Sequence, residues 1–138
     1  MKTSWFVPAV LFTIFLLLLA GCTDILPDRG AAVPTPGPVQ TLPQGKHVTI
    51  EVDQKDPIYA TVTVSFAGGE GQIAVTGIEL RFTTADGVVT TKPLQPVKGD
   101  EVIFQGTKET DRLEGWVTLN TGVTYKTLDM LIPYRTRG

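Results

Sequence analysis

The sequence is poor in the residues that build catalytic and metal sites. Its 138 residues include one histidine, His47, and one cysteine, Cys22. Zinc sites are built mainly from several Cys and His ligands, so an ordinary zinc site is excluded. The two serines are Ser4 and Ser65, and Ser65 lies within a predicted strand rather than on the sharp turn that exposes a nucleophile. We therefore expect no metal, no cofactor and no enzymatic activity.

The chain also lacks an excess of charge of either sign. It has 12 basic and 14 acidic residues, which gives a formal net charge of −2. Loss of Lys2 with an N-terminal leader would leave 11 basic residues against 14 acidic ones, a net charge of −3. No cluster of Lys or Arg marks a surface for nucleic acid or for an anionic membrane. Nucleic acid is therefore not an expected partner.

An apolar run at the N-terminus, Trp5 to Ala20, follows the positive charge of Lys2. As a helix, its 16 residues would span roughly 24 Å. The hydrocarbon core of a bilayer is thicker, roughly 30 Å. The run is thus typical of a signal peptide over residues 1–21 that is removed from the mature protein, with an uncleaved anchor as the alternative.

The run ends in Leu19-Ala20-Gly21-Cys22. This segment resembles the lipobox of prokaryotic lipoproteins, in which an aliphatic residue and two small residues precede a cysteine. The resemblance implies that a diacylglyceryl group is attached to the Cys22 sulfur and that the chain is cleaved between Gly21 and Cys22. Two acyl chains, at about 0.8 kcal/mol for each buried CH₂, anchor a protein stably. We predict a lipoprotein held at the extracytoplasmic face of a cell membrane.

Residues 22–45 are predicted to form a lipidated, proline-rich tether. Five prolines lie between Thr23 and Gly45, and proline removes a backbone donor and restrains the residue before it. A helix is therefore excluded here. A free tether of this length would reach roughly 27 Å as a flexible coil and about 70 Å as polyproline II. The alternative is an extended arm that lies on the domain.

Residues 46–138 have the period-two alternation of half-buried strands, and no window in them shows helical periodicity. Six or seven short strands separated by Gly, Pro and Asp turns predict an all-β, antiparallel β-sandwich of the immunoglobulin or fibronectin type III kind, with a small barrel as the alternative. The expected strands cover His47–Asp53, Ile58–Phe66, Ala74–Thr84, Val88–Thr91, Glu101–Gln105, Leu113–Leu119 and part of Val123–Tyr134.

Two local features refine this pattern. Pro93 and Pro96 interrupt pairing, which suits an edge strand or a crossover. Tyr125 and Leu128 are out of phase with a regular strand, so we expect a bulge or an irregular stretch in this segment. The arrangement as a whole resembles small archaeal envelope lipoproteins, through Asp56-Pro57-Ile58-Tyr59 and through the strand that contains Trp116. That resemblance covers most of the mature chain and implies no functional residues.

The acidic residues of the domain form small groups with cations between them. This pattern is typical of solvated ion pairs, and no spacing matches a calcium-binding loop. A pair of carboxylates for glycoside cleavage would need a cleft for which about 90 residues leave little room. The groups are Asp53 and Asp56, Asp100 and Glu101, and Glu109, Asp111 and Glu114, with the cations Lys55, Lys98, Lys108 and Arg112 between them.

The aromatic residues are the remaining candidates for contact with a partner. If Leu113, Val117 and their period-two neighbours face the core, Trp116 lies on the opposite face. A bulge at Gly115 would instead bury its ring. We expect a non-catalytic module with a structural or protein-interaction role at the cell envelope. The alternative is a module that binds a ligand such as a glycan through exposed Tyr59, Trp116 and Tyr125 on one sheet face.

Overall fold

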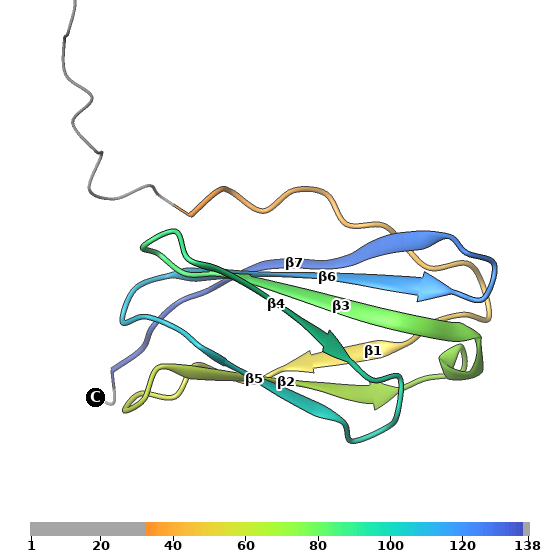
Figure 1. Cartoon of the computed structure of the whole chain (residues 1–138), viewed down its shortest axis with the longest axis horizontal. Coiled ribbons are helices and arrows are strands. Elements are labelled where there is room, and N and C mark those ends of the chain that lie inside the picture. Colours follow the sequence, from red (N-terminus) through yellow and green to blue (C-terminus); the bar gives the residue numbers. More distant parts are fainter. Residues whose placement is uncertain (1–32, 137–138) are drawn as a thin grey trace, which may run out of the picture.

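The computed structural model describes residues 33–136, which form two antiparallel sheets packed face to face (Figure 1). One sheet has the order β1-β2-β5 and the other has the order β4-β3-β6-β7. The predicted all-β, two-sheet fold is confirmed. The strands are β1 (Thr49–Val52), β2 (Thr61–Gly68), β3 (Val75–Thr83), β4 (Val89–Leu94), β5 (Glu101–Gln105), β6 (Asp111–Leu119) and β7 (Thr124–Ile132), with a short 3₁₀ turn, η1 (Gln72–Ala74), before β3.

The core lies between the sheets and is built by the alternation that the sequence shows. In β2, Val62, Val64 and Phe66 are fully buried, while the residues between them are half-buried on the outer face. Phe82 of β3 and Phe104 of β5 stack across the two sheets, with ring centroids 5.1 Å apart and an angle of 16° between the rings. Such offset stacking adds to the free energy gained by burying the rings.

The strand predicted from Ile58 begins later, at Thr61. Residues 56–60 form a turn instead, in which the Asp56 carboxylate accepts hydrogen bonds from the backbone N–H groups of Ile58 and Tyr59. An aspartate that bonds to nearby backbone in this way competes with sheet pairing. Ile58 is therefore 61% exposed rather than part of the core.

The last strand was predicted to contain a bulge or an irregular stretch, and it contains a bulge. Tyr125 and Leu128 both pack against the core although three positions separate them. Gly115 of β6 pairs with Leu128, and the next residue, Trp116, pairs with Lys126. One residue of β7 between these two pairs has no partner in β6, so the extra residue of the bulge lies in β7. A side chain at position 115 would lie 3.1 Å from Leu128 Cβ, which explains the glycine.

The edges of the two sheets are closed in different ways. Pro93 lies in β4, an edge strand, as its missing N–H requires. Lys92 Nζ donates a hydrogen bond of 2.7 Å to the carbonyl oxygen of Ile103 in β5, so its side chain bridges the two sheets on this side. Within residues 33–136, no helix is long and apolar enough to cross a membrane.

Candidate functional site

Residues 33–45, here called the arm, run along β7 on the outside of the four-stranded sheet (Figure 1). Gln40 N donates to the carbonyl oxygen of Lys126 at 2.7 Å, and Lys126 N donates to Gln40 Oε1 at 2.9 Å. Leu42 is buried within the core cluster. Over these residues the free tether that we predicted is not found, and the alternative of an extended arm describes them. Two backbone donors between the prolines, Gly37 N and Gln40 N, find acceptors on β7, and Leu42 anchors the end of the arm.

The arm covers a group of four charged side chains, here called the ionic cluster, which consists of Arg112, Glu114, Lys126 and Asp129. Arg112 donates to both oxygens of Asp129, from Nε at 2.8 Å and from Nη2 at 2.7 Å. Lys126 Nζ bridges the two carboxylates, at 2.8 Å from Glu114 Oε1 and 2.5 Å from Asp129 Oδ2. Gly37 N of the arm donates to Asp129 Oδ2 at 2.8 Å. The cluster therefore joins β6, β7 and the arm.

Burial makes these contacts stronger than ordinary surface pairs. The side chain of Asp129 has no exposed area, and that of Glu114 is 8% exposed. Hydrogen bonds from Arg112 hold the pKa of Asp129 far below its usual range, and those from Lys126 and Gly37 act in the same direction against the effect of burial. The hydrogen bond to Asp129 raises the pKa of both Arg112 and Lys126. All three groups therefore stay charged at neutral pH. We expected Arg112 and Glu114 to be solvated, whereas both are largely buried in a cluster to which the arm bonds through Gly37.

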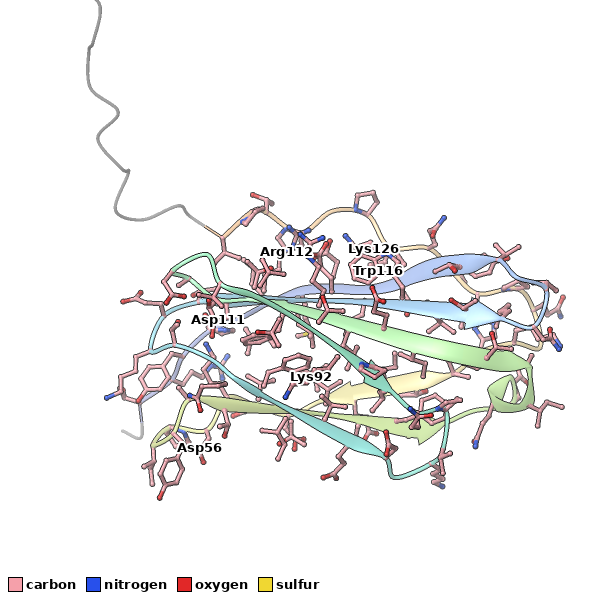
Figure 2. The ribbon with its side chains drawn as sticks, viewed as in Figure 1. Asp56, Lys92, Asp111, Arg112, Trp116 and Lys126 are labelled. Atoms are coloured by element: carbon pink, nitrogen blue, oxygen red, sulfur yellow. The ribbon has the colours of Figure 1, made fainter. Side chains whose placement is uncertain are left out.

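Trp116 lies beside this cluster on the outer face of β6, as Figure 2 shows. Leu113, Val117 and Leu119 of the same strand are buried in the core, so the predicted phase of the strand is correct. The bulge leaves this phase unchanged because its extra residue lies in β7. The indole is nevertheless half-buried, with Lys126 Nζ 5.6 Å from its ring centroid. A cation at this distance over an indole is attracted to it.

The other two candidate aromatics lie elsewhere. Tyr59 is 70% exposed at the tip of the β1–β2 turn. Tyr125 is half-buried and packs against the core from β7. The structure therefore does not gather Tyr59, Trp116 and Tyr125 on one sheet face.

A buried ion pair closes one end of the domain, where we had expected solvated charges. Lys55 Nζ lies 2.5 Å from Asp111 Oδ2, and neither side chain has any exposed area. Lys55 also donates to the carbonyl oxygens of Thr107 and Glu109, at 3.1 and 2.7 Å. All three hydrogens of the ammonium group thus have an acceptor.

The carboxylate of Asp111 is equally well satisfied. It accepts hydrogen bonds from Thr107 N and Oγ1 and from Ala85 N, besides the one from Lys55. The pair therefore holds together three loops, which join β1 to β2, β3 to β4, and β5 to β6. Asp111 lies two residues before the inward-facing Leu113 and is therefore on the same face of β6. This spacing is the signal in the sequence that could have revealed that Asp111 is buried. Gly106 leaves room for the carboxylate, since a Cβ there would meet Asp111 Oδ2.

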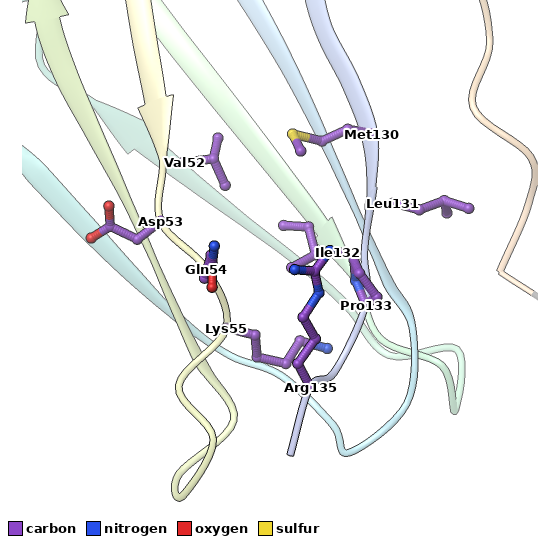
Figure 3. Close-up of a pocket in the computed structure, with 9 residues that line it drawn as sticks. All are labelled: Val52, Asp53, Gln54, Lys55, Met130, Leu131, Ile132, Pro133 and Arg135. Carbon is purple, nitrogen blue, oxygen red and sulfur yellow. The ribbon is translucent and has the colours of Figure 1, made fainter. Parts of the chain in front are cut away.

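In the part of the chain that the structure describes, two surface depressions lie near the end of β1, and the one drawn in Figure 3 lies between the ends of β1 and β7. This depression has a volume of about 140 Å³ and is lined by residues 52–55, 130–133 and Arg135. A wider one of about 570 Å³ adjoins it and is lined mainly by polar residues such as Asp53, Thr61 and Thr63. Neither lining includes Tyr59, Trp116 or Tyr125. Within residues 33–136, no three His, Cys, Asp or Glu side chains are placed to hold a metal ion.

Gly21 and Cys22, the predicted cleavage and lipidation residues, lie outside the described residues. The surface that the structure assembles is thus the arm, the ionic cluster and Trp116. It has the hydrogen bonds and charges to hold an extended chain. In comparisons with known proteins, no family model, no curated protein and no solved structure matches the chain.

Proposed function

We propose that this protein is a non-catalytic module, anchored by a lipid on Cys22 to the extracytoplasmic face of a cell membrane. Its domain would serve a structural or protein-contact role at the cell envelope. The observation that carries this proposal is the segment Leu19-Ala20-Gly21-Cys22 at the end of an apolar run, in register with the sole cysteine. The arm supports it, because a chain attached at Cys22 would enter the domain through a segment fixed to the sheet.

We also propose that the domain is a sandwich of the immunoglobulin or fibronectin type III kind. The strand order supports this, because three strands in the order β1-β2-β5 face four in the order β4-β3-β6-β7. The fourth strand pairs with the third rather than the fifth, as in the fibronectin type III variant of the fold. The shared architecture implies no particular activity.

The glycan-binding alternative has less support. A sugar platform needs aromatic faces that lie together and open to solvent, whereas Tyr59 lies at a turn and Tyr125 packs on the core. Trp116 is half-buried beside Lys126. The separation of the three rings therefore favours a structural or protein-contact role.

The anchor can be tested by labelling cells that express the protein with an alkyne-tagged fatty acid. We expect the wild-type chain to take up the label and the Cys22→Ser variant to lose it. Gly21→Ala is the matched control, because it keeps a small residue before the cysteine and should leave labelling unchanged. Equal labelling of the wild type and Cys22→Ser would contradict lipidation at this cysteine. Crosslinking on intact cells would then test the contact role, which the absence of any crosslinked envelope component would contradict.

A further inference from the structure

Two large apolar side chains stand next to each other at the tip of the β1–β2 turn. Ile58 is 61% exposed and Tyr59 is 70% exposed. Single exposed apolar side chains are common on protein surfaces, whereas adjacent ones form a continuous apolar surface of the kind that contact sites use. The tyrosine also carries a hydroxyl, which suits a boundary between water and an apolar phase.

The turn that presents them is held firmly by the domain. The Asp56 carboxylate accepts hydrogen bonds from Ile58 N at 2.7 Å and Tyr59 N at 2.6 Å. Gln105 Nε2 donates to the Tyr59 carbonyl, and the Tyr134 hydroxyl donates to the Pro57 carbonyl, each at 2.7 Å.

The backbone that follows the tip is strained. Ala60 has a φ of 56°, a conformation that residues with a side chain seldom adopt. Strain of this kind persists where the surrounding structure enforces it, and it is concentrated at functional sites. A contact made by a turn fixed in this way loses little conformational entropy.

The arm begins at the same end of the domain as this turn (Figure 1). Gly37 bonds to Asp129 and Gln40 bonds to Lys126, so the arm is antiparallel to β7. Its first residues therefore lie toward Ile132, the last residue of β7. Tyr134, two residues further on, contacts the turn at Pro57. The start of the arm and the turn thus share one end of the sandwich.

The length of chain before the arm is short compared with the domain. Ten residues, 23–32, separate Cys22 from Val33. A chain of this length spans roughly 18 Å as a coil, and at most about 38 Å when fully extended. The nine residues of β6 span about 30 Å, which approximates the distance to the other end of the domain. The end that carries the turn is therefore the one closest to a lipid on Cys22.

Exposure alone does not select this end. Ile73 of η1 is 93% exposed, and Val97 in the β4–β5 connection is 60% exposed. Both segments lie at the opposite end of the sandwich from the β1–β2 turn (Figure 1). The point where the chain enters the domain distinguishes the two. The opposite end would face away from the membrane.

We propose that Ile58 and Tyr59 insert into the headgroup region of the bilayer that holds the Cys22 lipid, and so fix the orientation of the domain on the membrane. This inference rests on the proposed lipid anchor. Tyrosine is enriched at the bilayer interface. Aliphatic side chains add to membrane binding through their buried apolar area. The tip adds to an anchor that already exists, so it needs no strong affinity of its own.

The test uses the full lipidated chain in vesicles of phosphatidylcholine and phosphatidylglycerol, with and without doxyl-labelled lipid as a quencher. A Trp116→Phe background removes the tryptophan of the domain. Tyr59→Trp then reports on the tip, with Ile58→Trp as a second reporter at the same site. Val97→Trp is the matched control, because that position is equally exposed at the opposite end. Thermal melts establish that each variant is folded.

We expect the emission of the tip reporters to shift to the blue and to be quenched by the doxyl lipid, while the Val97→Trp protein shows neither change. If the protein floats with the vesicles and the tip reporters stay unquenched, the insertion is refuted and the anchor stands. Equal quenching at both ends also refutes the proposed orientation. If the protein does not float and its Cys22 thiol is free, the anchor itself is refuted and the insertion with it.

Discussion

Replacing Asp111 by asparagine should be among the most damaging conservative changes in the domain. The substitution removes the charge that faces Lys55, whose side chain is fully buried. It also places an amide NH₂ where a carboxylate oxygen now accepts hydrogen bonds from Thr107 N, Thr107 Oγ1 or Ala85 N. An ammonium group would then stay buried without its partner.

The expected loss can be estimated from this burial. Breaking a fully buried ion pair by removing one partner costs about 3–5 kcal/mol. A domain of this size has a total stability of about 5–15 kcal/mol. At about 4–8 °C for each kcal/mol, a loss of about 4 kcal/mol lowers the melting temperature by roughly 15–30 °C.

Urea denaturation of the wild type and Asp111→Asn measures this difference directly. Glu109→Gln is the matched control, since it makes the same chemical change at an exposed position and should stay within about 0.5 kcal/mol of the wild type. Adding Lys55→Met to Asp111→Asn should recover part of the loss, because it removes the buried charge that has no partner. A cost below about 1 kcal/mol for Asp111→Asn would refute the view that this pair is desolvated.

Three further predictions concern the arm and its ionic cluster. Trp116 should be only partly quenched by acrylamide, and Lys126→Met should increase the quenching, whereas full quenching in the wild type would contradict the half-buried ring. Because the folded-state pKa of Asp129 is depressed, its stabilising contribution is complete above the unfolded value of about 3.9 and declines as the pH falls below it. Asp129→Asn should abolish much of this pH dependence of the unfolding free energy, as measured by urea titrations at several pH values. An unchanged dependence on pH would show that Asp129 is not its source. The same variant should also make trypsin cut faster after Lys46, because a neutral amide is a weaker acceptor for Gly37 N than the carboxylate is. Equal cutting rates, measured by mass spectrometry of the fragments, would show that this contact does not hold the arm.

Much of the strand pattern could be predicted from alternation. Val62, Val64 and Phe66 are buried because period two places them on one face, and the same periodicity placed Trp116 outside. The bulge in β7 followed from two core residues, Tyr125 and Leu128, that an unbroken strand cannot both turn inward.

Other features depend on partners that are distant in the sequence. The start of β2 was placed too early because Ile58 continues the alternation, while the Asp56 carboxylate bonds to the backbone and forms a turn. The burial of Lys55 could not be predicted locally, because its acceptors at 107, 109 and 111 lie more than 50 residues away. The proline-rich composition of the arm excludes a helix without saying whether the segment lies on β7.

The candidate site was only partly visible for the same reason. Period two put Trp116 on the outer face, but a bulge at Gly115 that would bury its ring stayed open as the alternative. Lys126, which lies over the ring, and the arm, which bonds to Asp129, come from separate segments. Arg112 and Glu114 belong to a group of mixed charge that is typical of solvated pairs, and nothing near them in the sequence shows that the arm bonds to their partner Asp129. The sequence pattern that predicts the lipid is local, and for that reason four consecutive residues suffice to predict it.

The intact mass of the mature protein, purified from membranes of the cells that make it, tests the proposed anchor most directly. We predict a chain that begins at Cys22 and carries the added mass of a diacylglyceryl group, with no thiol left to react with an alkylating reagent. A chain that begins elsewhere, or one whose Cys22 is alkylated quantitatively, would contradict the lipid anchor and the membrane location that follows from it.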